Sequence, residues 1–310
     1  MVTKKRIVIA GGTGLLGRYL VQAASEYDVV VLTRSVNRNL RTAQTVQWSP
    51  ESVSTANLNE INRLASILNG AHAIINLAGS SIGAGRLGPK HRRTVLESRL
   101  DSTSTLVEAF FRTRNPPKVW YQASAVGLYG DRGEELLTEN AGPGSSLLSD
   151  ITERWELSAQ PVSKIVRLVI GRGPSFAIAP EALAWRRFLK PIKGFIGGPL
   201  GGGKQWFTWI DAHDYARAVL HLIENESSCG AYNIVAPKPV RQIKLTQMLA
   251  RQLRKPAFLR VPAYGLRLIL GAVADELILA STRAIPGKLL SEEFDYHFPD
   301  LGELMKKMYS

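Results

Sequence analysis

The chain has 310 residues, of which 45% are hydrophobic and 21% are charged. This is more chain than one small core usually organises, and it lacks the low-complexity runs that are typical of disordered proteins. We therefore exclude a disordered protein and expect one large α/β unit, or a main domain with a smaller appendage.

The formal net charge is +13, from 39 Lys and Arg residues against 26 Asp and Glu residues. The basic residues are spread over both halves of the chain. The densest cluster, residues 90–93, has none of the interleaved aromatic residues that are typical of nucleic-acid surfaces. We expect no nucleic-acid partner, and the excess charge favours a solvated or anion-attracting face.

A single cysteine, Cys229, excludes an intrachain disulfide and a metal site built from several thiolates. His213 has no second histidine or cysteine at the spacing of metal ligands, so we interpret it as structural and expect no metal. This cysteine usage is typical of a reducing compartment, and we expect a cytoplasmic protein.

We expect no membrane segment either. The longest apolar stretch, residues 265–280, is interrupted by Arg267 and by the pair Asp275 and Glu276. A membrane-spanning helix needs about 20 uninterrupted apolar residues. The first apolar run, residues 7–10, begins too early for a signal segment to precede it.

Short β-branched runs alternate with amphipathic stretches in the first half of the chain, which is typical of βαβ units and a parallel sheet. The predicted strands there are residues 6–10, 29–33, 73–77, 119–124 and 165–170. The predicted helices there are residues 15–25 and 89–112. Beyond residue 172 we predict helices at 181–189, 212–224, 242–253 and 264–280, a glycine-rich loop at 194–203 and a strand at 232–235.

The first predicted strand runs directly into a glycine-rich turn and then a helix. Gly11, Gly14 and Gly17 keep the spacing Gly-x-x-Gly-x-x-Gly. Such a turn lets the backbone approach a pyrophosphate, which the free N–H groups of the helix N-terminus then bind. The sequence therefore predicts a dinucleotide site formed by Gly11, Gly12, Thr13, Gly14, Leu15, Leu16 and Gly17.

The end of the second predicted strand favours NADP(H) over NAD(H). An acidic residue there accepts from the ribose 2′-hydroxyl, whereas a basic one pairs with a 2′-phosphate. This chain has Thr33 and Arg34 at that point, with Arg38 and Arg41 nearby, and no carboxylate between Asp28 and Glu51. We predict Thr33 and Arg34 as cofactor contacts, the alternative being that Arg34 is only a solvated loop residue.

Four further segments resemble those of one protein family. They are residues 76–79 with Ser98 and Arg99 downstream, 124–131, 197–210 and 231–240. The chain resembles the atypical extended short-chain dehydrogenase/reductases, in the NAD-dependent epimerase/dehydratase-like subgroup whose members end in a small C-terminal domain of the DUF1731 type. The resemblance covers nearly the whole chain, and the tract through Trp209 is specific to the subgroup.

The resemblance implies a Rossmann-like doubly wound parallel sheet with a smaller C-terminal α/β substrate lobe. Residues 1–170 would form the NADP-binding domain, with 205–235 returning to it, and residues 171–204 and 236–310 would form the lobe. Leu77, Ala78 and Gly79 would line the nicotinamide side of the cofactor. Arg99, on the following helix, would complete the cofactor contacts.

The proton-transferring pair of this family is missing. Its members usually use a tyrosine whose pKa is lowered by a lysine four residues later, with a serine that orients the substrate oxygen. No tyrosine of this chain has a lysine at that position, and Leu148 and Thr152 stand where the pair is expected. Ser124 remains, and Tyr129 or Glu139 are alternative acids. Each of these three residues also has a non-catalytic alternative, which for Glu139 is that its side chain faces solvent.

The tract after the glycine-rich loop is the predicted substrate region. Gln205, Trp206 and Trp209 combine an amide with two indoles, which suits a partly apolar ligand with a polar or anionic end. Arg86 and Arg172 are further candidates for holding a charged group. The alternative is that both tryptophans are core residues that join the two lobes.

These patterns favour an NADP(H)-dependent oxidoreductase or epimerase-like enzyme that acts on a small carbonyl or hydroxyl compound, with anions among the candidates. The missing pair favours an alternative, a catalytically silent NADP(H)-binding sensor or assembly protein. Nucleic-acid binding through the basic excess is the third and weakest hypothesis. The sequence leaves the substrate and any homo-oligomer open.

Overall fold

The computed structural model describes residues 4–35, 40, 42–50 and 57–309. Arg38 and Arg41, which the sequence places near the cofactor, lie outside the described residues. No helix within the described part of the chain is both long enough and apolar enough to span a membrane.

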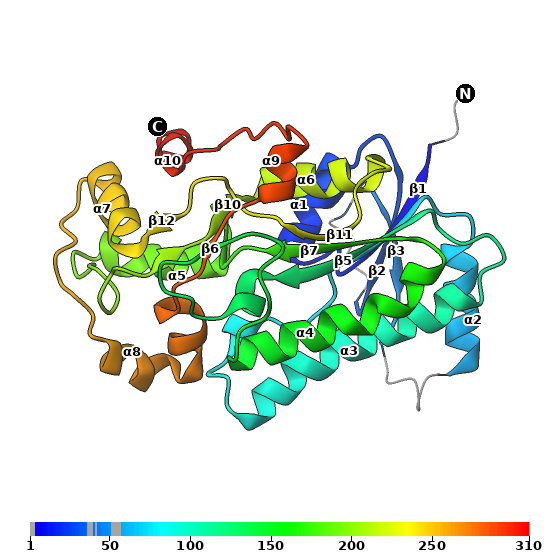
Figure 1. Cartoon of the computed structure of the whole chain (residues 1–310), viewed down its shortest axis with the longest axis horizontal. Helices are drawn as coiled ribbons and strands as arrows, with labels where there is room; N and C mark the ends of the chain where they lie inside the picture. Colours follow the sequence, from blue (N-terminus) through cyan, green and yellow to red (C-terminus); the bar gives the residue numbers. More distant parts are fainter. Residues whose placement is uncertain (1–3, 36–39, 41, 51–56, 310) are drawn as a thin grey trace.

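The fold is built on a parallel sheet of seven strands in the order β11-β7-β5-β4-β1-β2-β3 (Figure 1). The strand bounds are β1 Arg6–Ala10, β2 Asp28–Thr33, β3 Gln44–Gln47, β4 Ala73–Asn76, β5 Val119–Ala125, β7 Arg167–Gly173 and β11 Gly230–Asn233. The order runs outward in both directions from β1, so the crossovers reverse between β1 and β4. This arrangement confirms the predicted Rossmann-like doubly wound sheet.

Both faces of the sheet are buried, which explains why its strands read as continuous apolar runs. Along β1, Ile7 and Ile9 belong to one hydrophobic core, and Val8 and Ala10 belong to a second core on the opposite face. Helices α1 Leu15–Ala23 and α6 Ala212–Glu224 cover the first face. Helices α2 Leu58–Leu68, α3 Pro89–Phe111 and α4 Leu147–Ala159 lie along the other side (Figure 1).

The remaining elements gather at the end of the molecule that is opposite α2 (Figure 1). Their helices are α5 Leu183–Lys193, α7 Gln242–Leu253, α8 Ala263–Leu270 and α10 Leu301–Tyr309. The short helix α9 Gly287–Ser291 instead packs against β11, over the middle of the molecule (Figure 1). Three two-stranded pairs join them: β8 Phe176–Ile178 with β10 Trp209–Asp211, β9 Trp206–Phe207 with β12 Val240–Arg241, and β6 Leu136–Leu137 with β13 Arg283–Ala284. The predicted division into two domains stays a prediction.

Several predicted elements were wrong in their bounds. The helix predicted at 181–189 is α5, Leu183–Lys193, and the strand predicted at 232–235 is β11, Gly230–Asn233. The helix predicted at 264–280 is broken at Gly271, whose φ of 63° cannot continue a right-handed helix, and a π-helical turn follows at Ala274–Leu279. The strand predicted at 165–170 runs from Arg167 to Gly173, because a 3₁₀ turn, Gln160–Lys164, occupies the preceding residues.

β3 and α2 were not predicted from the sequence. β3 is a four-residue edge strand with glutamine at both ends, so it lacks an apolar run. α2 carried a readable signal, because its buried residues Ile61, Leu64, Ala65 and Leu68 keep helical spacing. Asn57 caps it by accepting from the backbone N–H of Asn59.

Candidate functional site

A crevice opens where the strand order reverses, at the ends of β1, β2 and β4. Its cavity has a volume of about 240 Å³. The loop after β1 contributes Gly11, Thr13 and Gly14, the end of β2 contributes Thr33 and Arg34, and the turn after β4 contributes Leu77, Ala78 and Gly79. The structure therefore brings together residues that the sequence predicted from three separate segments. Ligands of open α/β sheets bind at such a reversal.

The glycine loop packs against β4 too closely for side chains. Gly11 has a φ of 81°, and a Cβ there would lie 2.8 Å from the backbone carbonyl of Leu77. A Cβ on Gly17 would lie 2.5 Å from the carbonyl oxygen of Gly11. Gly12 and Gly17 are buried and do not line the cavity. These two glycines thus shape the loop, while Gly11 and Gly14 face the cavity.

The N-terminus of α1 lies at this cavity without a side-chain cap. Gly14 is the N-cap residue, and the first turn holds no acidic side chain. Leu15 and Leu16 form that first turn, so their backbone N–H groups have no acceptor within the helix. The free donors and the helix dipole make this end suitable for an anion.

Arg34 is the one charged residue among the described residues that line the crevice, and none of these residues is a carboxylate. Its backbone is held in place, because the carbonyl of Arg34 accepts from Gln47 Nε2 at 3.3 Å. Thr33 Oγ1 donates to the carbonyl of Ser35 at 2.9 Å and so fixes the turn that follows β2. The Arg34 side chain is exposed and pairs with no described carboxylate.

Buried amides hold the turn after β4. Asn76 Oδ1 accepts from the backbone N–H of Ala78 at 3.2 Å, and Asn76 Nδ2 donates to Thr103 Oγ1 and to Gln122 Oε1. Ser98 Oγ accepts from the backbone N–H of Ser80 at 2.9 Å. These bonds tie the 77–80 turn to α3 and β5, so the crevice wall is built before any ligand arrives.

Arg99 supports this turn from behind and does not line the crevice. Its Nη1 donates to the carbonyls of Ser80 and Val95, both at 2.9 Å, and its guanidinium lies 4.8 Å from the ring centre of Trp155. The side chain is buried without a carboxylate partner among the described residues, and this burial lowers the pKa of Arg99 to about 10. Arg99 therefore positions this turn, and its direct contact with a cofactor stays a prediction.

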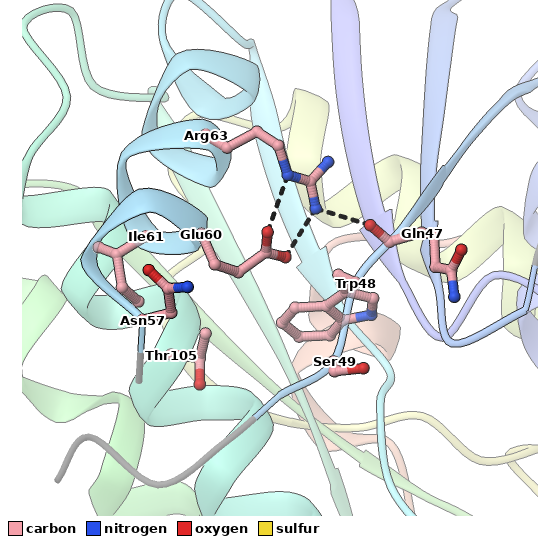
Figure 2. Close-up of a pocket in the computed structure, with 8 residues that line it drawn as sticks. All are labelled: Gln47, Trp48, Ser49, Asn57, Glu60, Ile61, Arg63 and Thr105. Carbon is pink, nitrogen blue, oxygen red and sulfur yellow. Dashed lines mark hydrogen bonds and ion pairs between the residues drawn. The ribbon is translucent and has the colours of Figure 1, made fainter. Parts of the chain in front are cut away.

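A second cavity, of about 370 Å³, adjoins the crevice across Trp48 (Figure 2). Trp48 is buried, lines both cavities and directly follows β3. It was not predicted as a site residue, and its aromatic side chain at the end of a strand is the signal that could have identified it. In Figure 2, Arg63 lies over Glu60, with Nη2 2.6 Å from Oε1, and also donates to the carbonyl of Gln47. This cavity therefore has no free cation among the residues drawn in it.

Ser124, at the end of β5, belongs to a buried polar network. Its Oγ donates to Glu156 Oε1 at 2.5 Å. Arg172 holds the same carboxylate with two bonds, from Nε at 2.9 Å and from Nη2 at 3.0 Å. Burial lowers the pKa of Arg172, but its bonds and ion pair with Glu156 outweigh burial and raise it overall. The ion pair is thus complete inside the protein.

Tyr129 is fully buried in the same network. Its hydroxyl donates to Asn233 Oδ1 at 2.7 Å and accepts from Arg172 Nη1 at 3.0 Å. Burial raises the pKa of Tyr129, and the nearby Arg172 opposes that shift only in part. The structure therefore gives Tyr129 a packing environment and not an open position beside a substrate.

Glu139 is buried too, contrary to the solvent-facing alternative. Its Oε1 accepts from the backbone N–H groups of Asn233 and Lys288 at 3.1 and 3.2 Å. The carboxylate therefore links the sheet edge to α9.

Comparison with known proteins decides the family. An epimerase family protein of Staphylococcus aureus (strain MRSA252) is 32% identical over 99% of both chains. The chain belongs to the epimerase family. Residues 7–146 match the NAD dependent epimerase/dehydratase family, and residues 261–308 match a domain of unknown function, DUF1731.

Solved structures agree with this membership. The human epimerase family protein SDR39U1 (isoform 2), crystallised with NADPH, has a TM-score of 0.86 at 26% identity and covers 98% of this chain and 99% of its own. A nucleoside-diphosphate sugar epimerase from Corynebacterium glutamicum has a TM-score of 0.75 at 27% identity, covering 97% of this chain and 57% of its own.

In this epimerase family chain, two buried residues that pack against a neighbouring turn stand where the tyrosine and the lysine are expected. A Cβ on Gly127 would lie 3.4 Å from Leu148 Cβ and 3.9 Å from Thr152 Oγ1. Leu148 and Thr152 are both buried against the turn that follows Ser124. Neither position carries a phenol or a cation, because Leu148 is apolar and Thr152 offers only an aliphatic hydroxyl.

The predicted substrate residues of the lobe mostly make structural contacts. Trp209 is fully buried, and its Nε1 donates to the Lys238 carbonyl at 3.0 Å. Both observations favour the alternative that Trp209 is a core residue. Gln205 Nε2 donates to the carbonyls of Leu200 and Ile278. Arg86 is exposed, and its Nη2 donates to the Leu268 carbonyl at 2.7 Å, joining the loop before α3 to α8.

Two cations contact the ring of Trp206. The guanidinium carbons of Arg241 and Arg283 are 4.1 and 4.5 Å from its ring centre. Its Nε1 donates to Glu134 at 3.0 Å, and Arg241 also pairs with that carboxylate. His213 is largely exposed, and its ring lies edge-on to Tyr19. The described residues contain no group of three or more histidine, cysteine or acidic side chains able to hold a metal.

Proposed function

We propose that this epimerase family protein binds NADP(H) in the β1/β4 crevice and acts as an oxidoreductase or epimerase on a small carbonyl or hydroxyl compound. The observation that carries the cofactor choice is Arg34, the one charged residue among the described residues that line the crevice, none of which is a carboxylate. An arginine there suits the 2′-phosphate of NADP(H), whereas NAD(H) is typically held by an acidic residue. The human relative crystallised with NADPH supports the same choice.

The crevice residues fit this cofactor. The loop 11–17 brings its backbone and the uncapped N-terminus of α1 to the cavity, as a pyrophosphate requires. Thr33 and Arg34 would hold the 2′-phosphate, and Leu77, Ala78 and Gly79 offer small or apolar surfaces to the nicotinamide side. The bound cofactor supplies or accepts a hydride.

In this proposal Ser124 binds the substrate oxygen and Glu156 exchanges a proton with it. Ser124 Oγ donates a hydrogen bond to the Glu156 carboxylate, and Arg172 holds the same carboxylate with two further hydrogen bonds. The pair would thus do part of the work of the missing tyrosine and lysine.

A second candidate is a protein that binds NADP(H) without turnover. Leu148 and Thr152 fill the place of the proton-transferring pair, and Tyr129 is fully buried. These observations support a sensor or assembly protein that keeps the cofactor site alone.

Titration of the full chain with NADPH and NADH, followed by nucleotide fluorescence, tests the cofactor. We expect tighter binding of NADPH, and equal or tighter binding of NADH would overturn the proposal. Incubation of the NADPH complex with a panel of aldehydes, ketones and sugar nucleotides tests turnover. NADPH oxidation or formation of an epimerised product that is lost in Ser124→Ala supports the enzyme, since an epimerase regenerates its cofactor. Tight binding without oxidation and without any product supports the silent protein.

A further inference from the structure

The net positive charge of the chain comes from two segments. Residues 182–210 and 227–274 contain thirteen Lys and Arg residues and no Asp or Glu. The other 26 basic residues are matched by the 26 acidic residues of the chain, so these two segments account for the net charge of +13. Their cations lie on and around α5, α7 and α8, which gather at one end of the fold (Figure 1).

The two segments lie side by side. β9 pairs with β12, and the backbone N–H of Leu259 donates to the Gly197 carbonyl at 3.2 Å. Lys255 Nζ lies 3.7 Å from the centre of the Phe195 ring. The end of α5, the connection after α7 and helix α8 therefore form one surface. We name it the α8 face, made of residues 193–197, 254–260 and 263–270.

Large apolar side chains are exposed on the α8 face. Phe258, Tyr264 and Leu268 are 74%, 76% and 75% exposed, and on α8 itself only Leu266 is buried. Single exposed apolar side chains are ordinary, but a group of them on neighbouring segments marks an interaction surface. The members that are more than half exposed are Phe195, Ile196, Phe258, Tyr264, Leu268 and Ile269.

Cations stand among these apolar side chains. Arg254 and Arg260 are exposed and Lys255 is half-buried, and none of the three pairs with an acidic side chain among the described residues. Arg267, on α8, pairs with Asp275 at 2.9 Å. The α8 face therefore combines unpaired positive charge with exposed apolar surface.

This combination favours one kind of partner. A second copy of the chain would bring like charges together, which is unfavourable. The exposed apolar side chains come from three stretches of the chain and line neither the crevice nor the cavity of Figure 2, which favours a broad partner surface over a peptide in a groove. An anionic lipid surface matches both properties, because cations bind its phosphate groups while apolar and aromatic side chains enter the headgroup region.

We propose that the α8 face binds the surface of a membrane that contains anionic lipid. Phe258, Tyr264 and Leu268 enter the headgroup region, and Arg254 and Arg260 contact lipid phosphates. The contact is peripheral, so it needs no membrane-spanning helix.

Sedimentation of the full chain with lipid vesicles tests this proposal. Vesicles of phosphatidylcholine alone are compared with vesicles in which about a third of the lipid is phosphatidylserine. We expect binding to the phosphatidylserine vesicles and binding about tenfold or more weaker to phosphatidylcholine alone. Added NaCl should weaken the binding, because salt screens the attraction between the cations and the lipid surface.

A charge variant locates the basic part of the face. Arg254→Gln, Lys255→Gln and Arg260→Gln together should weaken binding about 100-fold, which is about fivefold for each cation. The matched control removes the same charge from exposed residues outside the face and should bind nearly as the unchanged protein does. Its substitutions are Arg114→Gln, Lys118→Gln and Lys164→Gln.

An apolar variant locates the inserted part. Leu268→Ser with Ile269→Ser should weaken binding about tenfold and keep its dependence on salt, because the cations remain. Leu157→Ser removes a leucine that is 59% exposed on α4 and is the control. All substituted side chains are exposed or half-buried, and unfolding midpoints without lipid show that each variant is folded.

Several results would overturn the proposal. One is the absence of any preference for phosphatidylserine vesicles, and another is equal weakening in the charge variant and its matched control. Unchanged binding in the apolar variant, with poly-glutamate bound as tightly as the vesicles, would assign the face to an acidic protein. A dimer detected by light scattering without lipid and dissociated by the apolar variant, with no vesicle binding, would assign it to a second copy of the chain.

Discussion

The Oγ of Ser124 lies 2.5 Å from the carboxylate of Glu156, and this bond joins β5 to α4. The same carboxylate receives both bonds from Arg172 on β7, so three elements meet at one buried charge pair. A buried ion pair of this kind is costly to leave half-made, because the remaining charge loses its partner in a region of low polarity. The relationship therefore matters for stability as well as for the proposed chemistry.

Glu156→Gln should lower the free energy of unfolding by about 3 kcal/mol or more, since it leaves the Arg172 guanidinium buried without a counter-charge. Urea denaturation at neutral pH measures this change. Glu153→Gln is the control, because Glu153 is exposed on the same helix and should change stability little. Similar losses in the two variants would contradict the role given to the buried pair.

The crevice could be predicted from the sequence because its signals are local. Gly11, Gly14 and Gly17 follow one strand directly, and Arg34 stands at the end of the next strand. Each residue can be read without knowing which distant segments it meets. The contact of Gly11 with Leu77 then follows from the order of the parallel strands.

The buried network could not be predicted in the same way. Ser124, Tyr129, Glu156, Arg172 and Asn233 come from separate elements, and no spacing along the chain records that they meet. Glu139 shows why burial could not be predicted from the sequence there. Its polar neighbours favour solvent exposure, but in the fold its carboxylate is buried and accepts from two backbone N–H groups.

Arg34→Ala should weaken NADPH binding about 10- to 100-fold and leave NADH binding nearly unchanged, because only NADPH carries the 2′-phosphate. Fluorescence titration with both nucleotides measures the effect. Arg93→Ala, an exposed arginine on α3 away from the crevice lining, serves as the control. Equal weakening toward both nucleotides would show that Arg34 acts on the loop and not on the phosphate.

Gly17→Ala should destabilise the protein by about 1–3 kcal/mol, as is usual for an overpacked site. Its Cβ would lie 2.5 Å from the Gly11 carbonyl oxygen, so the nucleotide loop must move and NADPH affinity should fall as well. Gly83→Ala is the matched control, because a Cβ there meets nothing within 4 Å. The prediction fails if Gly17→Ala keeps both the unfolding midpoint and the affinity of the unchanged protein.

Glu292 should make stability depend on pH in the acid range. Burial raises the pKa of Glu292, but bonds from Tyr232, His221, Ser228 and Asn225 outweigh burial and lower it overall. A carboxyl with a lowered folded pKa stabilises the fold fully above its ordinary pKa of about 4.3, and this contribution disappears as the pH falls through the lowered value.

Urea denaturation at several pH values between neutral and acid measures this dependence. Glu292→Gln should unfold more easily at neutral pH and lose part of the decline in stability below about pH 5. Glu293→Gln changes an exposed neighbour with the same charge and should keep the whole decline. An unchanged pH profile in Glu292→Gln would remove this carboxyl as a cause.

Tyr129→Phe separates a structural tyrosine from a proton donor. Tyr129 is fully buried between Asn233 and Arg172, so loss of its hydroxyl leaves a buried Arg172 donor with one fewer acceptor. We expect a loss of about 1–3 kcal/mol in the free energy of unfolding. Turnover with any substrate found for the protein should stay within a few-fold of that of the unchanged protein at temperatures where the variant is folded.

Tyr264→Phe, which alters a strongly exposed tyrosine, is the control and should change neither quantity. A fall in kcat of about 100-fold or more with unchanged stability is the size that a lost proton donor produces, and it would return Tyr129 to the chemistry.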